Sequence, residues 1–425
     1  MRKLSVPNTY VIIAALLAIS AVATWLVPGG EPQTWQVLTS VYHGFVKQAG
    51  IIIFILVVGG AFSLLNSTGA VASGISRFIA RVGNRDKLIL AALTVLFSLA
   101  GAVFGMSEET IPFVGIVVPL AVSMGYDAIM GMLVVYVSSN VGFSSAFLNP
   151  FTVGIAQEMA DLPPFSGMGY RIFCWAFLTV LMVIFVLVYA RKTQRKPAGE
   201  EVMAAGSESM TRRQAWILAV LFLTVALLIY GVTCRKWYLP EITGLFLAMG
   251  LVCGIIAGFS ANRIAEELLA GAKDILSAAL VVGVASGIII VLQDGKVIDS
   301  LFKTLQDGLD GTGPLASLSA MYGIQALINF LLPSATAKAA ITIPVMAPFS
   351  DLVGVSRQAM VLAFQFGDGF TNMLTPTSGV LIAALAMARI PYTKWVRWIW
   401  KGVVVLLVLG LLLLIPTVFF PIKGF

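Results

Sequence analysis

Polar residues and prolines interrupt long apolar segments at matching places in the two halves of this chain. In the first half the sequence FGMSEETIP covers residues 104–112, and in the second half FLLPSATAK covers residues 330–338. About thirty residues further on, a second pair follows: FSSAFLNPFT at 143–152 and FTNMLTPTS at 370–378. In a membrane protein, hydrophobic segments broken at corresponding positions of two halves indicate a transport site at the interface of an internal repeat.

The composition predicts an all-α polytopic membrane protein. Hydrophobic residues make up 59% of the 425 residues and charged residues 11%, far from the composition of soluble domains. Apolar segments long enough to cross a bilayer recur throughout the chain. The net charge of +7 would suggest a nucleic-acid partner in a soluble protein, but here the basic residues lie mostly in short loops. Such residues set the orientation in the membrane, so we expect no nucleic-acid partner.

Catalytic and metal-binding residues are scarce. Cys174, Cys234 and Cys253 lie in apolar segments without metal-ligand spacing, and His43 is the single histidine. We therefore expect no cofactor, no metal centre and no enzymatic activity. A membrane enzyme would need a nucleophile–base pair or a metal cluster. A channel would need a continuous polar pore, whereas the polar residues here converge on two tips and two breaks.

The chain is predicted to consist of two repeats joined by a linker. The first repeat covers 1–190, a cytoplasmic linker with one connecting helix covers 191–232, and the second repeat covers 240–425. A signal-peptide-like start precedes the first crossing, but the polytopic pattern favours an uncleaved helix. An amphipathic stretch at 70–82 is expected along the membrane interface, and another lies near 297–308. The uninterrupted crossings are expected at 8–27, 49–66, 170–190, 213–232, 240–259, 277–294 and 395–420.

Two pairs of short apolar arms predict re-entrant helical hairpins at 88–124 and 314–350. The first pair is separated only by Ser107 to Thr110, and the second by Ser334 to Lys338. The first gap is too short and too acidic for an ordinary loop, and carboxylates at membrane depth are tolerated only inside protein or a wet cavity. Two full crossings per hairpin are the alternative.

Two further crossings are predicted to be broken. Asn149-Pro150 interrupts 129–160, and Thr375 to Ser378 interrupts 357–388. Because proline removes a backbone donor, it frees carbonyls one turn earlier, and these can hold a cation such as Na⁺. Helix N-termini exposed at tips and breaks can hold an anion such as a carboxylate. Ordinary kinks satisfied by Ser and Thr are the alternative, but four interruptions paired across a repeat favour a binding site.

Counting the crossings relates the two halves. If both hairpins do not cross, about nine crossings remain, and 49–66 lies five crossings before 277–294, with which it shares Val-Val-Gly. An odd separation makes the halves inverted repeats, whereas counting hairpin arms as crossings would make them parallel. In the inverted arrangement most of the 27 Lys and Arg residues lie on one side, which is cytoplasmic by the positive-inside rule. We expect a multi-pass protein of the plasma (bacterial inner) membrane, with its N-terminus cytoplasmic and its C-terminus external.

The candidate site gathers the polar residues of both tips and both breaks around one small organic solute near mid-membrane. The candidate substrate- or ion-binding residues are Ser107, Glu108, Glu109, Thr110, Asn140, Asn149, Pro150, Thr152, Ser334, Thr336, Lys338, Asp368, Asn372, Thr375, Pro376, Thr377 and Ser378.

These motifs resemble those of known carriers. Pro333 to Pro344 is similar to the hairpin-tip Ser-Asn-Thr signature of divalent anion:sodium symporters, with Ala335 in place of the asparagine. Ala363 to Asn372 and Met106 to Pro112 resemble the C4-dicarboxylate anaerobic carrier-like family, which includes basic amino-acid (arginine/ornithine-type) antiporters. The resemblance covers nearly the whole chain. It implies a secondary transporter with a scaffold and a mobile domain that moves as an elevator, assembled as a homodimer.

Charged residues inside the membrane are costly and usually functional, and here they are Glu108, Glu109, Lys338 and Asp368. Aligning the repeats sets Glu109 opposite Lys338, so an ion pair between these two is one expectation. The other gives Lys338 the place of a coupling Na⁺, with Glu108 or Glu109 meeting a cationic solute. We expect a basic amino-acid antiporter or an H⁺-coupled carrier of a carboxylate-bearing solute. A C4-dicarboxylate or other organic-anion symporter coupled to Na⁺ or H⁺ is the alternative.

Overall fold

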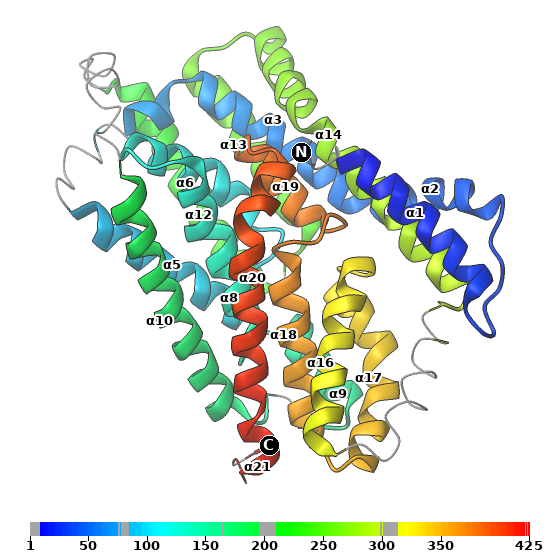
Figure 1. Cartoon of the computed structure of the whole chain (residues 1–425). Coiled ribbons are helices and arrows are strands. Elements are labelled where there is room, and N and C mark those ends of the chain that lie inside the picture. Colours follow the sequence, from blue (N-terminus) through cyan, green and yellow to red (C-terminus); the bar gives the residue numbers. More distant parts are fainter. Residues whose placement is uncertain are drawn as a thin grey trace, which may run out of the picture.

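The computed structural model describes residues 9–74, 77, 85–163, 165–194, 210–235, 237–297, 300, 313–420, 422 and 424–425. Within these residues every regular element is helical (Figure 1). Seven helices are long and apolar enough to cross a membrane. The first helix and the helices of the two broken crossings are not among these seven. The prediction of a helical multi-pass membrane protein is confirmed, and the count of nine crossings stays a prediction.

The first three helices all pack on α14: α1 (Thr9–Leu26), α2 (Gln36–Lys47) and α3 (Ala49–Ser67). α1 and α3 match two predicted crossings, whereas α2 was not predicted. α2 packs on α14 at Gly44, where an added Cβ would lie 2.5 Å from the Gly283 carbonyl oxygen. The expected amphipathic stretch begins as a helix at residues 70–74, and most of its remainder lies outside the described residues.

The two predicted arms of the first hairpin are helices α5 (Asp86–Phe104) and α6 (Thr110–Ser123). Gly105 ends α5 with a φ of 68°, a left-handed conformation that glycine adopts without a steric penalty. The first broken crossing follows, with helical turns on both sides of the interruption. Its parts are α7 (Ala128–Met132), η2 (Leu133–Val137), α8 (Ser138–Ser144), η3 (Pro150–Gly154) and α9 (Ile155–Met159).

The helix restarts at Pro150 because Asn149 caps it. The side-chain oxygen of Asn149 accepts a hydrogen bond from the Phe151 N–H at 2.9 Å. Both η2 and η3 are π-helical, a geometry that is rare and frequent at functional sites. The break therefore lies where the sequence predicts it.

The second half repeats the order of a hairpin followed by a broken crossing. α14 contains the predicted crossing at 277–294 but begins earlier, at Ala261, where the Ser260 side chain caps it by accepting from the Arg263 N–H. Its first turns carry charges and lack the apolar run that marked the crossing. From the last crossing of the first half onward, the helices are α10 (Met168–Thr193), α12 (Arg212–Arg235), α13 (Leu239–Ala257), α14 (Ala261–Asp294), α16 (Pro314–Leu331), α17 (Ala335–Leu352), α18 (Arg357–Asn372), α19 (Gly379–Met387), α20 (Tyr392–Leu414) and α21 (Pro416–Phe419).

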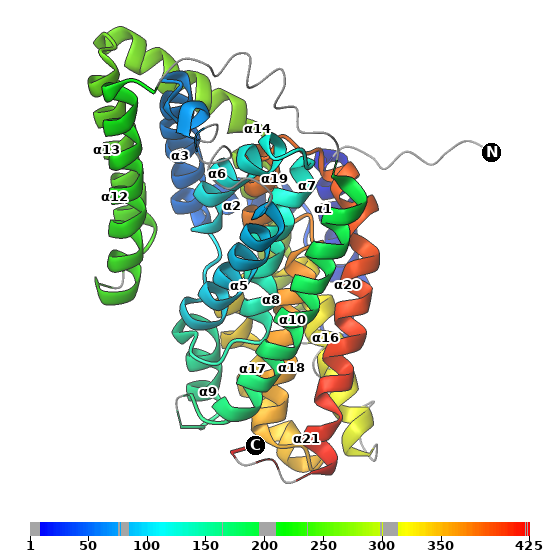
Figure 2. The ribbon, with the colours of Figure 1, turned by 90° about the vertical axis from the view of Figure 1, so that its left-hand side faces the viewer.

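The helices form two groups. α1, α2 and α3 pack along α14, and α12 and α13 stand beside α3 (Figure 2). In the other group α5 packs on α8, α16 packs on α18, and α8 contacts α18 at the centre. Each hairpin also reaches the other half, since α6 packs on α19 and α17 packs on α9.

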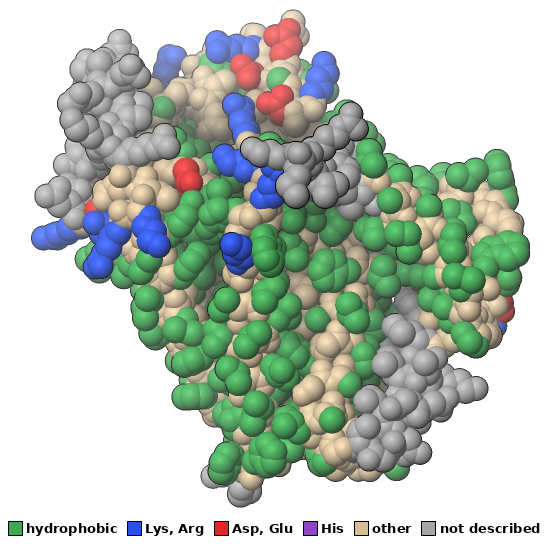
Figure 3. Space-filling model, in the orientation of Figure 1, with side chains coloured by type: hydrophobic (Ala, Val, Ile, Leu, Met, Phe, Trp, Pro, Cys, Tyr) green, Lys and Arg blue, Asp and Glu red, His purple; other side chains and the backbone are tan. Residues whose placement is uncertain are grey.

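The bases of the two hairpins, where the first arm begins and the second arm ends, lie at opposite ends of the molecule. Asp86, at the start of α5, accepts hydrogen bonds from Tyr126, which follows α6, and from Gln194, which follows α10. At the other end Arg357 binds Asp351, which lies in the last turn of α17, at 2.8 Å, and Asp161, which follows α9, at 2.9 Å. Lys and Arg side chains gather on the upper part of the face in Figure 3, above a broad apolar surface.

Candidate functional site

A fully buried ion pair lies at the base of the second hairpin tip. Lys338 is in the first turn of α17 and Asp368 is on α18, and Lys338 Nζ lies 2.7 Å from Asp368 Oδ1. Neither side chain is exposed. The predicted ion pair between Glu109 and Lys338 is therefore wrong. Aligned positions of two repeats occupy equivalent places in their own halves, and Lys338 takes its partner from the helix packed beside it.

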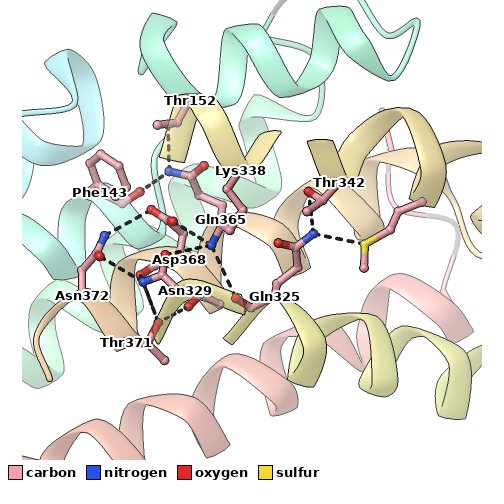
Figure 4. A network of polar contacts seen from close by, with 12 residues as sticks. Phe143, Thr152, Gln325, Asn329, Lys338, Thr342, Gln365, Asp368, Thr371 and Asn372 are labelled. Carbon is pink, nitrogen blue, oxygen red and sulfur yellow. Dashed lines mark hydrogen bonds and ion pairs between the residues drawn. The ribbon is translucent and has the colours of Figure 1, made fainter. Parts of the chain in front are cut away.

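The Lys338 ammonium is surrounded by oxygen atoms (Figure 4). Besides Asp368 it donates to the side-chain oxygen of Asn329 at 3.1 Å and to the Gln325 carbonyl oxygen at 3.5 Å. The ring of Phe364 lies 5.1 Å from Nζ on another side. Carboxylate, amide and carbonyl oxygens are also the ligands of a bound metal cation, so the ammonium fills a place that a small cation can take.

Asn329, on α16, organises the partners of Asp368. Its Nδ2 donates to the Asp368 carbonyl oxygen at 3.0 Å, to Thr371 Oγ1 at 2.9 Å and to Asn372 Oδ1 at 2.9 Å. Asn372 in turn donates to Asp368 Oδ2 at 3.3 Å. Sequence reasoning identified Asp368 and Asn372 but missed Asn329, although a polar residue inside an apolar hairpin arm was a usable signal.

Gln365 joins the two halves. Its Nε2 donates to the Phe143 carbonyl oxygen at 2.6 Å and to Thr152 Oγ1 at 2.9 Å, on either side of the first break. Gln365 was not predicted either. The side-chain oxygens of Gln365 and Gln325 are buried and lack a hydrogen-bond partner among the described residues. Two unsatisfied acceptors near an ion pair can receive a donor from a solute or a proton carrier.

The hydroxyl groups at the second break form hydrogen bonds to the end of the first arm of the second hairpin. Thr375 and Thr377 donate to the Phe330 carbonyl oxygen at 3.4 and 2.8 Å, and their hydroxyls lie 3.0 Å apart. Ser378 caps α19 by accepting from the Leu381 N–H at 3.3 Å. Pro376, between the two threonines, is buried. In the described conformation these side chains form hydrogen bonds with the Phe330 carbonyl oxygen and the Leu381 N–H.

The first hairpin tip is acidic. The Glu109 side chain is 8% exposed and accepts from the Ser107 N–H at 3.1 Å, while Thr110 donates to the Ser107 carbonyl oxygen. Glu108 is half-buried. Among the described residues no Lys or Arg side chain forms an ion pair with either glutamate. A pair of carboxylates without a cationic partner attracts a positively charged group.

The remaining predicted residues connect the tips and breaks. Thr336, at the exposed second tip, donates to the Phe151 carbonyl oxygen at 3.2 Å, and Ser334 beside it is exposed. Asn140 donates to the carbonyl of Tyr136, whose hydroxyl reaches the Asn372 carbonyl oxygen at 3.0 Å. The second tip thus meets the first break.

One buried donor at the first break has no partner. The Asn149 side chain is 0% exposed, and its Nδ2 lacks a hydrogen bond within the described residues. Among all the residues that the structure describes, no group of three His, Cys, Asp or Glu side chains is placed to hold a metal ion.

Comparison with known proteins places this chain in a family. The C4-dicarboxylate anaerobic carrier family matches residues 32–419. An Escherichia coli K12 protein named "Putative basic amino acid antiporter YfcC" is 33% identical, with 93% of each chain covered. An uncharacterised Haemophilus influenzae protein is 25% identical over 90% of this chain and 78% of its own. The solved Alcanivorax borkumensis YdaH transporter is 18% identical over 98% of this chain and 100% of its own, with a TM-score of 0.46.

Proposed function

The chain belongs to the C4-dicarboxylate anaerobic carrier family, a family of membrane transporters, and we propose that it exchanges basic amino acids across the inner membrane, as the name of its Escherichia coli relative suggests. The observation that carries the proposal is the acidic first tip, where Glu108 and Glu109 have no basic partner among the described residues. Carboxylates inside the membrane need a cation, and a guanidinium or ammonium of the solute supplies one.

The carboxylate of the same amino acid needs donors. Helices begin at Ala335, Pro150 and Gly379, beside the second tip and both breaks, and helix N-termini favour a negative group. Asn149 Nδ2 adds a buried donor that has no protein partner within the described residues. A solute with an acid and a base fits a site with donors on one side and carboxylates on the other.

We further propose that transport needs no Na⁺. The Lys338 ammonium contacts three oxygens and already supplies a positive charge beside the tip where sodium-coupled relatives are expected to hold their ion. A second cation there would be repelled in a medium of low dielectric constant. Exchange, or coupling to H⁺, follows from this arrangement.

Inverted repeats and an elevator movement in a homodimer complete the proposal. The opposite positions of the hairpin bases and the matched packing of α5 on α8 and α16 on α18 support the inverted arrangement. The group around α14 would be the scaffold, and the hairpins with the broken crossings the moving domain.

Exchange assays test the substrate and the coupling. Proteoliposomes preloaded with L-arginine or L-ornithine should take up labelled L-arginine, empty ones should not, and Na⁺ and K⁺ buffers should give equal rates at matched pH. The second candidate, symport of a C4-dicarboxylate, is favoured by the family's name. Uptake of succinate into empty vesicles, driven by Na⁺ and without arginine exchange, would replace the proposal by that candidate.

A further inference from the structure

A second buried cation lies away from the candidate transport site. Arg171, on the first turn of α10, is 0% exposed. Its neighbour Gln358 is at the start of α18 and Asp368 is further along the same helix, about 15 Å away at 1.5 Å per residue. Nothing in the proposed exchange uses this arginine.

No carboxylate among the described residues forms an ion pair with Arg171, and the Phe425 ring lies 5.9 Å from its Cζ. Its Nε and Nη1 lack hydrogen-bond partners among the described residues, and Nη2 makes one long contact, 3.4 Å, with Gln358 Oε1. The carboxylates that form ion pairs at this end, Asp161 and Asp351, are both bound by Arg357. A buried guanidinium without an ion-pair partner is unfavourable, and a bound anion would balance its charge.

Amide, carbonyl and hydroxyl groups lie beside the Arg171 guanidinium on the side of Gln358. Gln157, 0% exposed, donates to Gln358 Oε1 at 3.1 Å and to the Ser166 carbonyl oxygen at 2.8 Å. The Gln358 amide donates to the Ser166 hydroxyl. These contacts fix α9, the loop before α10 and the start of α18 around the arginine.

The N-terminus of α10 adds to the positive field. No side chain caps it, so the first N–H groups of this 26-residue helix are not satisfied by a capping side chain. Arg171 lies in the first turn of this helix, and Phe425 packs at the N-cap Gly167, where an added Cβ would lie 2.8 Å from Phe425 Cε2. A helix N-terminus and a guanidinium together favour an anion.

We propose that Arg171 and the N-terminus of α10 form a site for one compact monovalent anion, chloride or a small carboxylate such as formate, enclosed between α9, α10 and α18. The anion is compact because the guanidinium is closed off from the surface. It neutralises Arg171 and holds the first turn of α18 against the loop before α10.

Thermal unfolding of the purified full-length protein tests the site. The apparent Tm is measured in sodium chloride, sodium formate and sodium gluconate at constant ionic strength, since a bound ligand raises it. A saturable rise in chloride or formate, absent in gluconate, is expected, and the arm that responds identifies the anion. Identical curves in all three salts would overturn the proposal.

Variants separate this site from other effects of salt. Gln358→Glu places a carboxylate against Arg171, so the Tm in gluconate should rise and the response to the anion should disappear. Arg171→Met should also lose the response, and Arg357→Met, which removes a partly buried arginine bound to Asp161 and Asp351, should keep it. Stabilisation by L-arginine should persist in Gln358→Glu if the transport site is separate. If Gln358→Glu responded to chloride and formate as the natural protein does, the site would be refuted.

Discussion

The Lys338 ammonium and the Asp368 carboxylate hold each other's charge where neither water nor lipid reaches them. Such a pair contributes little net stability compared with apolar residues, but removing one partner leaves a buried charge, which costs about 3–5 kcal/mol. The pair therefore fixes how the second hairpin tip lies on α18. Its partners were not predictable from spacing alone, because Asp368 and Asn329 meet Lys338 through the packing of three helices.

Lys338→Met should destabilise the protein by about 3–5 kcal/mol, and the double variant with Asp368→Asn should recover much of the loss. The freed carboxylate, with Asn329 and Gln325 beside it, should also bind a small cation. Thermal unfolding in NaCl and KCl compares the variants with the natural protein. Equal losses in the single and double variants, without a response of Lys338→Met to either cation, would contradict this role of the pair.

Glu109→Gln should raise the KM for L-arginine exchange about tenfold or more, because a hydrogen bond to a charged group contributes about 1.5–3 kcal/mol. Glu266→Gln, on the exposed first part of α14, is the matched control and should leave exchange unchanged. The measurement is initial rates over a range of arginine concentrations. An unchanged KM in Glu109→Gln would remove this carboxylate from the site.

Among the elements, the arms and breaks were predictable because their signals are local. Asn149-Pro150 ends one helix and caps the next, and Gly105 ends α5, each within a few residues. The early start of α14 was missed because its first turns carry charges, and α2 was not predictable because its packing on α14 depends on residues more than two hundred positions apart. Gln365 was missed for the same reason: its partners Phe143 and Thr152 lie in the other half.

The crossing of α8 and α18 depends on a glycine. A Cβ at Gly369 would lie 2.2 Å from Ser144 Oγ and 2.9 Å from Ser144 Cα. Gly369→Ala should therefore push the helices apart, lower the Tm and reduce exchange, at a cost of about 1–3 kcal/mol for overpacking. Gly323→Ala, on α16 with nothing within 4 Å of its Cβ, is the control and should be neutral or slightly stabilising. Equal Tm values for both variants would show that the crossing adapts.

For the molecule as a whole, the orientation in the membrane is the prediction that decides between inverted and parallel halves. In a Cys234→Ser background, Phe420→Cys should react with a membrane-impermeant maleimide added outside intact cells. Lys192→Cys should react only after the cells are opened, since the basic end is retained in the cytoplasm. Cys174 and Cys253 are buried and need no change. Labelling of both introduced cysteines from the same side would make the halves parallel.

The hydrogen bonds of Gln365 join residues that are synthesised at different times. Its partners Thr152 and Phe143 precede it by 213 and 222 residues. At a ribosomal rate of about 5–20 residues per second, the first broken crossing waits roughly 10–45 s for this side chain. During that time a backbone carbonyl and a hydroxyl destined for a buried contact have no final partner, and lipid offers none. The insertion machinery or retained water has to shelter the first half of the chain until the second half is made.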